Sequence, residues 1–555
     1  MGCRAVEPPD VLRIRCLGRV SFAEAHALQS ALHGGTEDDY LLLVEHPHVF
    51  TLGVRGDPAH ILVDPSSVGA EVVETDRGGD VTYHGPGQLV VYPVVQVPAS
   101  SGSVPRHVAA VEQVAIDALS DLGIRAGRLA QYPGVWVDPE GPSPRKIAAV
   151  GVRVTRGRSM HGLALNVDPD LTWFRRIVPC GITDKAVTSL RAEGCQASMA
   201  EVTEAVIGAA RRQWSPAAEP DRQPASQPDQ QEGALPVGQR APGASLRHRL
   251  RQAGVDPDGG QSVRARKPPW LRVPVRMGAD FHALRRTVRE LDLVTVCEEA
   301  GCPNIFECWA DGTATFMING DRCTRACGFC LVDTRKPLPL DGGEAERVAA
   351  AVTRFGLAHA VITAVARDDL PDGGAGSFAA VVAAIRCQSP GTAVELLIPD
   401  CKGDAGALGV IFDSRPDVLN HNLETVARLQ RAVRPSAGYA RSLAVLARAK
   451  AAGLTTKSGL ILGMGESEDE VVSALADLAA VGVDIVTMGQ YLRPSAAHAP
   501  VTRWWTPEEF DALAGRARAM GFAHVQASPL TRSSYHARAA ASAAGADALV
   551  TATCP

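Results

Sequence analysis

The segment CTRACGFC, residues 323–330, carries three cysteines in the pattern C-x3-C-x2-C. The segment CEEAGCPNIFECW, residues 297–309, carries three more in the pattern C-x4-C-x5-C. The whole chain has 13 cysteines in 555 residues, so an even spread would place fewer than one between residues 297 and 330. Such clustering needs a chemical cause, and clustered cysteines in a reduced protein favour metal binding over disulfides.

The bulk composition is that of an ordinary globular protein, with 46% hydrophobic and 21% charged residues. The net charge of −5 gives no general attraction to nucleic acid. No run of about 18 apolar residues is present, so we expect no membrane span. Residues 1–16, MGCRAVEPPDVLRIRC, lack the apolar stretch of a signal peptide. We therefore expect a cytoplasmic protein, in which thiols stay reduced.

The length of 555 residues predicts two or more domains. Residues 215–245, SPAAEPDRQPASQPDQQEGALPVGQRAPGAS, are rich in Pro, Gln, Ala and Gly. This segment has almost no apolar side chain to bury, so we expect a disordered linker. The linker would separate a domain of residues 1–214 from a domain of residues 246–555.

Both halves have the mixed pattern of the α/β class. The first half has buried strand patterns at 40–53 and 87–97 and an amphipathic helix pattern at 105–123. In the second half, helical patterns at 345–356 and 468–482 lie between strand patterns at 359–365, 393–399, 417–423, 455–466 and 483–492. Repeated βα units predict a parallel barrel, whose chemistry takes place at the C-terminal ends of its strands.

Cys323, Cys327 and Cys330 suit an iron–sulfur cluster with one free corner. Three thiolates hold three irons of a 4Fe–4S cluster and leave the fourth iron open to a small chelating ligand. Structural zinc is the alternative, although zinc sites usually take four protein ligands, commonly in pairs. The motif resembles the radical SAM superfamily, whose open iron binds S-adenosylmethionine. The resemblance implies a full or partial (β/α) barrel and a 5′-deoxyadenosyl radical that abstracts hydrogen from carbon.

The two triplets together resemble lipoyl synthase over roughly residues 260–540, with RKPPWLRV at 266–273, DVLNHNLETV at 417–426 and RSSYHA at 532–537. The resemblance implies a second, auxiliary 4Fe–4S cluster. Its ligands would be Cys297, Cys302, Cys308 and Ser534. This cluster would be dismantled to supply two sulfur atoms for C6 and C8 of a protein-bound octanoyl chain. A sulfur-inserting enzyme with another substrate, such as biotin synthase, is the alternative.

In the first half, RGGDVTYHGPGQLVVYP at 77–93 suits a loop whose main chain approaches a ligand closely. Cys180 lies between proline and glycine, which favours a turn. A thiol in such a turn can be a nucleophile if a nearby cation stabilises its thiolate, and Lys146 is the candidate cation. A structural cysteine is the alternative interpretation.

These segments resemble lipoyl(octanoyl) transferase over roughly residues 10–212, an α/β fold related to biotin and lipoate protein ligases. The resemblance implies that Cys180 attacks the octanoyl thioester on acyl carrier protein, while Lys146 lowers the cysteine pKa and relays protons. A lipoate–protein ligase would keep the lysine without needing Cys180. His84 and His161 are interpreted as positioning or structural residues. The residues that would line the acyl site are Arg77, Gly78, Gly79, Asp80, Val81, Thr82, Tyr83, His84, Ala149, Val150, Gly151, Gly162, Leu163 and Ala164.

The two resemblances together imply a bifunctional enzyme of lipoate biosynthesis that uses S-adenosylmethionine and two 4Fe–4S clusters per chain. The expected protein partners are octanoyl-acyl carrier protein and lipoyl carrier domains, namely the glycine cleavage H protein and the acyltransferase subunits of 2-oxoacid dehydrogenases. An iron–sulfur carrier protein and a flavodoxin or ferredoxin would complete the set. The alternative is that the N-terminal half only docks the carrier for a radical enzyme.

Overall fold

The structure is a computed structural model that describes residues 12–179, 185–215, 245–263, 265–272, 286–295, 304–310 and 313–546. Its contacts divide the chain into two compact units, Met1–Ser226 and Gln227–Pro555. The expected linker lies outside the described residues, except for its two end residues, 215 and 245. Each unit is described by itself below.

The N-terminal unit contains a large mixed sheet with strand order β1-β2-β6-β10-β9-β8-β7, and β11 pairs with β9. A smaller sheet has the order β4-β3-β5. The strands of the large sheet are β1 (Arg13–Arg19), β2 (Tyr40–Glu45), β6 (Gln88–Val94), β7 (Ala126–Leu129), β8 (Tyr132–Val137), β9 (Arg145–Thr155), β10 (Arg158–Asn166) and β11 (Ala186–Val187). Those of the small sheet are β3 (Val49–Leu52), β4 (Glu71–Glu74) and β5 (Val81–His84).

Three α-helices accompany these sheets: α1 (Phe22–Gly35), α2 (Ser103–Asp121) and α3 (Met199–Trp214). The first and third begin at capping boxes, in which Ser21 pairs with Glu24 and Ser198 pairs with Glu201. The helix predicted at 105–123 is confirmed as α2, with Gly123 in the left-handed region just after its end. The apolar side of α2 packs with α3 and the large sheet in one hydrophobic core.

The C-terminal unit is an open eight-stranded sheet whose strands follow the chain in order from β12 to β19. From β13 onward all neighbouring strands are parallel, and only β12 runs antiparallel to β13. The strands are β12 (Val294–Thr295), β13 (Thr313–Ile318), β14 (His359–Ala364), β15 (Ala393–Leu397), β16 (Val418–Asn420), β17 (Thr456–Leu462), β18 (Ile485–Gln490) and β19 (His524–Ala527).

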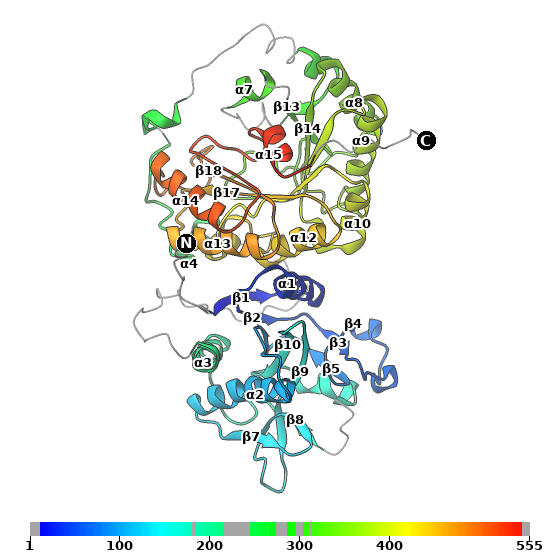
Figure 1. Cartoon of the computed structure of the whole chain (residues 1–555), viewed down its shortest axis with the longest axis vertical. Coiled ribbons are helices and arrows are strands. Elements are labelled where there is room, and N and C mark those ends of the chain that lie inside the picture. The colour runs from blue at the N-terminus through cyan, green and yellow to red at the C-terminus, as the bar shows by residue number, and fades with distance from the viewer. Residues whose placement is uncertain are drawn as a thin grey trace, which may run out of the picture. The chain divides into compact units, whose positions relative to one another are not determined.

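Helices follow most of these strands and lie along the outside of the curved sheet (Figure 1). They are α8 (Glu344–Phe355), α9 (Ala375–Gln388), α10 (Ala405–Asp413), α11 (Ala427–Val433), α12 (Tyr439–Ala451), α13 (Glu468–Ala480) and α14 (Pro507–Ala519). Shorter helices are α4 (Leu246–Gln252), α7 (Ile305–Ala310) and α15 (Ala537–Ala543). Alanines of α15 pack with Val418 and Ile485, the first residues of β16 and β18.

This architecture confirms the predicted α/β class and the parallel βα pattern of the second half. All five predicted strand segments of that half contain a strand of the sheet. Sequence reasoning missed β13 and β19, which are also parallel members. Among the helices that the structure describes, none combines the length and apolar character needed to cross a bilayer.

The core between the sheet and its outer helices depends on large buried side chains such as Phe316 of β13, which is 0% exposed. We expect Phe316→Ala to lower the free energy of unfolding by about 3–5 kcal/mol, because it removes buried apolar surface and leaves a cavity. Urea unfolding checks this value. The matched control is Val410→Ala on α10, where Val410 is 44% exposed and the expected change is within about 0.5 kcal/mol. Equal effects for the two variants would contradict the packing.

Candidate active sites

The loop that carries Cys323, Cys327 and Cys330 follows β13 and is fixed by its own main chain. The amide of Cys323 donates to the carbonyl of Asp333 at 2.8 Å. The amide of Gly328 donates to the carbonyl of Val433 at 2.7 Å. These bonds hold the loop at the end of the sheet where the parallel strands finish, as the barrel prediction requires.

Arg325 is the main side-chain anchor of this loop. Its guanidinium donates to both carboxylate oxygens of Asp368 at 2.8 Å and to Asp400 at 2.6 Å. Burial alone would raise the pKa of both carboxyl groups, but the guanidinium outweighs burial and holds both pKa values below their usual range. The side chain of Arg325 is 6% exposed and that of Asp400 is 0% exposed, so loss of this fork would deprive a buried carboxylate of its nearest cation.

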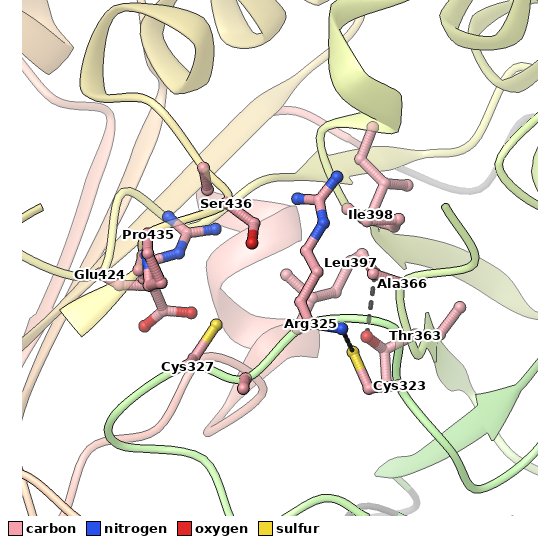
Figure 2. Close-up of a pocket in the computed structure, with 15 residues that line it drawn as sticks. Cys323, Arg325, Cys327, Thr363, Ala366, Leu397, Ile398, Glu424, Pro435 and Ser436 are labelled. Atoms are coloured by element: carbon pink, nitrogen blue, oxygen red, sulfur yellow. Dashed lines mark hydrogen bonds between the residues drawn. The ribbon is translucent and has the colours of Figure 1, made fainter. Parts of the chain in front are cut away.

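A pocket opens beside the loop, at the C-terminal ends of β14 and β15. Figure 2 shows the thiols of Cys323 and Cys327 at this pocket, with the carboxylate of Glu424 beside Cys327. Burial is the main cause that raises the pKa of Cys327 to about 11; Arg434 opposes the rise, and the neighbouring Cys330 and Cys323 add to it. The three cysteines of the predicted cluster are therefore brought together. A metal that binds these thiols takes the place of their protons.

Glu424 shares the pocket with a second arginine. Burial raises the pKa of Glu424 above its usual range, while Arg434 and a hydrogen bond from Asn422 oppose that rise. Arg434 donates to the carbonyls of Asn422 and Leu423 at 3.1 and 3.2 Å, which fixes the main chain leading to Glu424. The pocket thus offers a carboxylate and a guanidinium, the groups that bind the ammonium and carboxylate of an amino acid.

The ligand set predicted for the auxiliary cluster is described only in part. Cys297 and Cys302 lie outside the described residues. Cys308 lies in α7, and the structure places its segment against that of Ser534. The hydroxyl of Tyr535 donates to the carboxylate of Glu307 at 3.2 Å. The neighbours of Cys308 and Ser534 are therefore in contact across more than two hundred residues of chain.

In the N-terminal unit, the loop of Arg77 and Gly78 lies on β9. The amide of Gly78 donates to the carbonyl of Val152 at 3.0 Å. A Cβ atom at Gly151 would lie 2.8 Å from the carbonyl oxygen of Gly78, so only glycine permits this approach. The guanidinium of Arg77 donates to the carbonyl of Thr51 at 2.6 Å, which ties the loop to β3.

The other two predicted acyl-site segments pair with each other. Gly151 lies opposite Gly162, Val150 opposite Leu163, and Ala149 opposite Ala164, in the antiparallel pair β9–β10. Gly78 contacts β9 through its bond to Val152. The three predicted segments, which begin at Arg77, Ala149 and Gly162, therefore lie together.

Not every predicted lining residue presents its side chain to that place. Val81 and Tyr83 belong to a small hydrophobic core with Phe50 and Trp173, so only their main chain is available to a ligand. Thr82 is buried between them on β5. The carboxylate of Asp80 instead accepts from the amide of Asp57 at 3.0 Å and contacts His60 at 2.5 Å.

Burial favours the neutral form of His84 and His161, the two histidines singled out from the sequence. Burial lowers the pKa of His84 to about 3, and its Nδ1 lies 2.8 Å from the side-chain oxygen of Gln88. Burial likewise lowers the pKa of His161 to about 3, and its Nε2 lies 2.6 Å from Asp76. A histidine that stays neutral across the physiological range positions its neighbours rather than cycling protons.

Lys146 lies on β9 and is buried, with 6% of its surface exposed. A Cβ atom at Gly134 would lie 2.9 Å from Cε of Lys146 and 2.6 Å from the carbonyl oxygen of Ala148. Glu112 of α2 accepts from the amide of Gly134 at 2.9 Å and so fixes the strand that packs on the lysine. Gly134 is thus the residue that leaves room for the Lys146 side chain.

Cys180 lies outside the described residues, which stop at Pro179 and resume at Lys185. Among the described residues that follow, 187 and 188 contact Lys146. Val187 of β11 pairs with Lys146, and the amide of Thr188 donates to the carbonyl of Lys146 at 2.9 Å. The pairing of Cys180 with Lys146 stays a prediction.

Sequence reasoning missed the anchoring residues of both sites, chiefly Arg325, Glu424 and Glu112. A signal existed for Arg325. An arginine between clustered cysteines at the end of a buried strand needs a carboxylate partner, and RDD at 367–369 supplies one. Glu112 carries no such signal, because it is one acidic residue among many on an amphipathic helix.

Comparison with protein families agrees with this geometry in both units. Residues 19–211 match the lipoyl protein ligase A/B catalytic domain. Residues 250–302 match the N-terminal domain of lipoyl synthase of the radical SAM family, and residues 317–478 match the radical SAM superfamily. A lipoyl synthase of Mycobacterium avium (strain 104) is 58% identical over 272 residues, which are 49% of this chain and 89% of that protein. The C-terminal part of this chain belongs to the lipoyl synthase family.

Two further relatives are similar to parts of this chain, one as a lipoyl synthase and one as a lipoate protein ligase. A lipoyl synthase of Mycobacterium ulcerans (strain Agy99) is 54% identical over 297 residues, which are 54% of this chain and 92% of that protein. A bipartite lipoate protein ligase of Thermoplasma acidophilum is 17% identical, covers 37% of this chain and 84% of that protein, and has a TM-score of 0.32. The family matches, by contrast, show that the chain combines a lipoate ligase/transferase-type catalytic domain with a lipoyl synthase region.

The residues present fit the cofactors of this family, which are S-adenosylmethionine and iron–sulfur clusters. The loop of Cys323, Cys327 and Cys330 gathers three thiols, and Cys323 and Cys327 are the cysteines among the described residues that line the pocket. A donor set of three thiols suits a cluster with one open iron better than structural zinc.

The Arg325 anchor can be tested in the lipoyl synthase domain by Arg325→Lys. Lysine keeps the charge but cannot make the forked contact with Asp368 and Asp400. We expect the iron retained after anaerobic reconstitution and gel filtration to fall by about four atoms per chain. The control is Arg335→Lys in the same loop, because Arg335 is 74% exposed and pairs with Asp333 at the surface. Unchanged iron in Arg325→Lys would contradict the anchoring role.

The close contact between Gly134 and the Lys146 side chain can be tested in the transferase-type domain with Gly134→Ala. The added methyl group would meet the lysine side chain and the carbonyl of Ala148. If Lys146 takes part in the acyl transfer that we propose below for this domain, we expect that transfer to fall by at least about a hundredfold, because a displacement of a reacting group by about 1 Å costs that much rate. The control is Gly34→Ala, since nothing lies within 4 Å of the added atom there. Transfer at the parental rate by a folded Gly134→Ala chain would contradict the role of this contact.

Proposed function

We propose that the two domains catalyse consecutive steps on one octanoyl group. The N-terminal domain, residues 1–214, transfers octanoate from acyl carrier protein to a lysine of a lipoyl carrier domain. The C-terminal domain, residues 246–555, then inserts sulfur at C6 and C8 of the same chain. The observation that best supports the first step is the buried Lys146, on the strand that also carries Ala149, Val150 and Gly151.

In the first step, the thiolate of Cys180 attacks the octanoyl thioester, the acyl–sulfur bond to acyl carrier protein breaks, and the thiolate of acyl carrier protein leaves. The amine of the carrier lysine then attacks the acyl-cysteine, and the Cys180 thiolate leaves as the amide forms. Lys146 stabilises the thiolate and carries the proton between amine and leaving sulfur. Thioester exchange followed by amide formation runs downhill without ATP, in line with the lack of a G-x4-G-K-[ST] loop in the sequence.

In the second step, Cys323, Cys327 and Cys330 would hold one 4Fe–4S cluster, and Cys297, Cys302, Cys308 and Ser534 would hold the other. When bound, the first cluster supplies the electron that cleaves S-adenosylmethionine, and the second supplies the two sulfur atoms. Arg325 positions the first loop, and Glu424 with Arg434 would bind the amino-acid part of S-adenosylmethionine beside it.

The proposed partners follow from these steps. Octanoyl-acyl carrier protein is the acyl donor, and the carrier is a glycine cleavage H protein or the acyltransferase subunit of a 2-oxoacid dehydrogenase. A flavodoxin or ferredoxin supplies electrons, and an iron–sulfur carrier protein rebuilds the auxiliary cluster. All of these reactions suit the cytoplasm, where the thiols stay reduced.

Two substitutions test whether the steps are separate. We expect Cys180→Ala to abolish octanoyl transfer to a carrier domain while sulfur insertion into a previously octanoylated carrier continues. We expect Cys297→Ala to have the reverse effect and to reduce bound iron from about eight to about four atoms per chain. Mass spectrometry of the carrier and iron analysis measure both. Transfer that survives in Cys180→Ala would mean that the N-terminal domain uses another nucleophile. About four irons per chain in both the parent and the variant would show that the auxiliary cluster is absent.

A further inference from the structure

A column of buried polar side chains stands inside the C-terminal sheet. Nζ of Lys457, on β17, lies 3.0 Å from each carboxylate oxygen of Glu395, on β15. Their side chains are 0% and 1% exposed. A buried ion pair of this kind recovers its desolvation cost only when its remaining polar groups are also paired.

Asn420 of β16 continues this column. Its amide nitrogen donates to the carboxylate of Glu395 at 2.9 Å and to the hydroxyl of Ser533 at 3.1 Å. The carboxylate accepts one hydrogen of this amide, so the second hydrogen is directed at Ser533. Lys457 thus fixes the carboxylate of Glu395, and this carboxylate fixes the side-chain amide of Asn420. The amide in turn donates a hydrogen bond to the Ser533 hydroxyl.

The hydroxyl of Ser533 is used as both acceptor and donor. It accepts from Asn420 and donates to the side-chain oxygen of Asn422 at 3.0 Å. Asn422 in turn donates to the carboxylate of Glu424 at 3.1 Å, at the edge of the pocket beside Cys327. Removal of the Ser533 hydroxyl would leave two side-chain amides without this partner in a partly buried place.

Ser533 is the neighbour of Ser534. On the other side of Ser534, the hydroxyl of Tyr535 contacts Glu307, the neighbour of Cys308. Ser534 therefore lies between two fixed residues, one tied to the inside of the sheet and one tied to α7. A hydroxyl oxygen is a harder and weaker ligand for iron than a thiolate, so its binding depends on how well it is placed beforehand.

We propose that Ser533 is a positioning residue that presents Ser534 to the auxiliary cluster, and that the column Lys457–Glu395–Asn420 sets its place. This inference rests on the proposed function, in which Ser534 is a ligand of that cluster. Loss of the Ser533 hydroxyl frees the segment of Ser534, and the auxiliary cluster then releases iron faster. The other cluster, whose three thiolates do not involve this segment, is unaffected.

The test compares the two clusters one at a time in the full chain. A background with Cys323, Cys327 and Cys330 all changed to Ala keeps only the auxiliary cluster. A background with Cys297, Cys302 and Cys308 changed to Ala keeps only the other. Each is reconstituted anaerobically, its iron per chain is measured, and the release of iron to a chelator is followed with Ser533, with Ser533→Ala and with Ser533→Thr.

In the auxiliary-only background, we expect Ser533→Ala to release iron about tenfold faster, as for loss of a buried hydrogen bond, and Ser533→Thr to stay within about twofold of the parent. In the background that keeps only the other cluster, we expect the same rate of iron release with Ser533, with Ser533→Ala and with Ser533→Thr. We also expect Asn420→Ala to speed release, and Asn420→Ala with Ser533→Ala to add little to either alone, because both act through one contact.

Three outcomes would overturn the inference. Equal release from Ser533→Ala and its parent would show that the hydroxyl does not place the ligand. Equal acceleration in both backgrounds would show that the substitution only weakens the sheet. An auxiliary-only background that binds no iron even with Ser533 intact would remove the cluster itself, and thereby the proposed function on which the inference rests.

Discussion

The pairing of buried charge inside the C-terminal sheet is the constraint on which the lipoyl synthase domain depends. The ion pairs of Arg325 with Asp400 and of Lys457 with Glu395 lie where little or no solvent reaches them. Such groups are tolerated only in fixed geometry, since breaking a buried pair leaves a charge without compensation. The contacts of Arg325 fix the cysteine loop. The Lys457–Glu395 pair is connected to Ser533, the neighbour of Ser534, through hydrogen bonds of Asn420.

The N-terminal domain solves a similar problem by other means. Its candidate cation, Lys146, lies against the bare Cα of Gly134, and three main-chain segments meet on β9 through glycines at 78, 151 and 162. These glycines allow the main chains of the three segments to approach one another closely. In the proposed function, the two domains act on the same acyl group by different chemistry.

The sequence was sufficient to predict the α/β class and the parallel strands, because βα alternation is a local pattern, and the spacing of Cys323, Cys327 and Cys330 placed three thiols in one loop. It could not reveal Glu112, Glu395 or Lys457 as partners, since their contacts join residues far apart in the chain. Nor could it tell that Val81 and Tyr83 face a separate small core, because a buried strand of apolar and polar residues does not indicate which core each side chain enters.

The most direct test of the central claim is a single-turnover assay with the whole reconstituted chain. An unmodified carrier domain is mixed with octanoyl-acyl carrier protein, S-adenosylmethionine and a reductant, and its mass is followed with time. We predict that the carrier first gains an octanoyl group and then two sulfur atoms, with about one lipoyl group formed per chain, because one auxiliary cluster supplies the sulfur for one product. A carrier that is octanoylated but never gains sulfur, or one that is never octanoylated, would contradict the account.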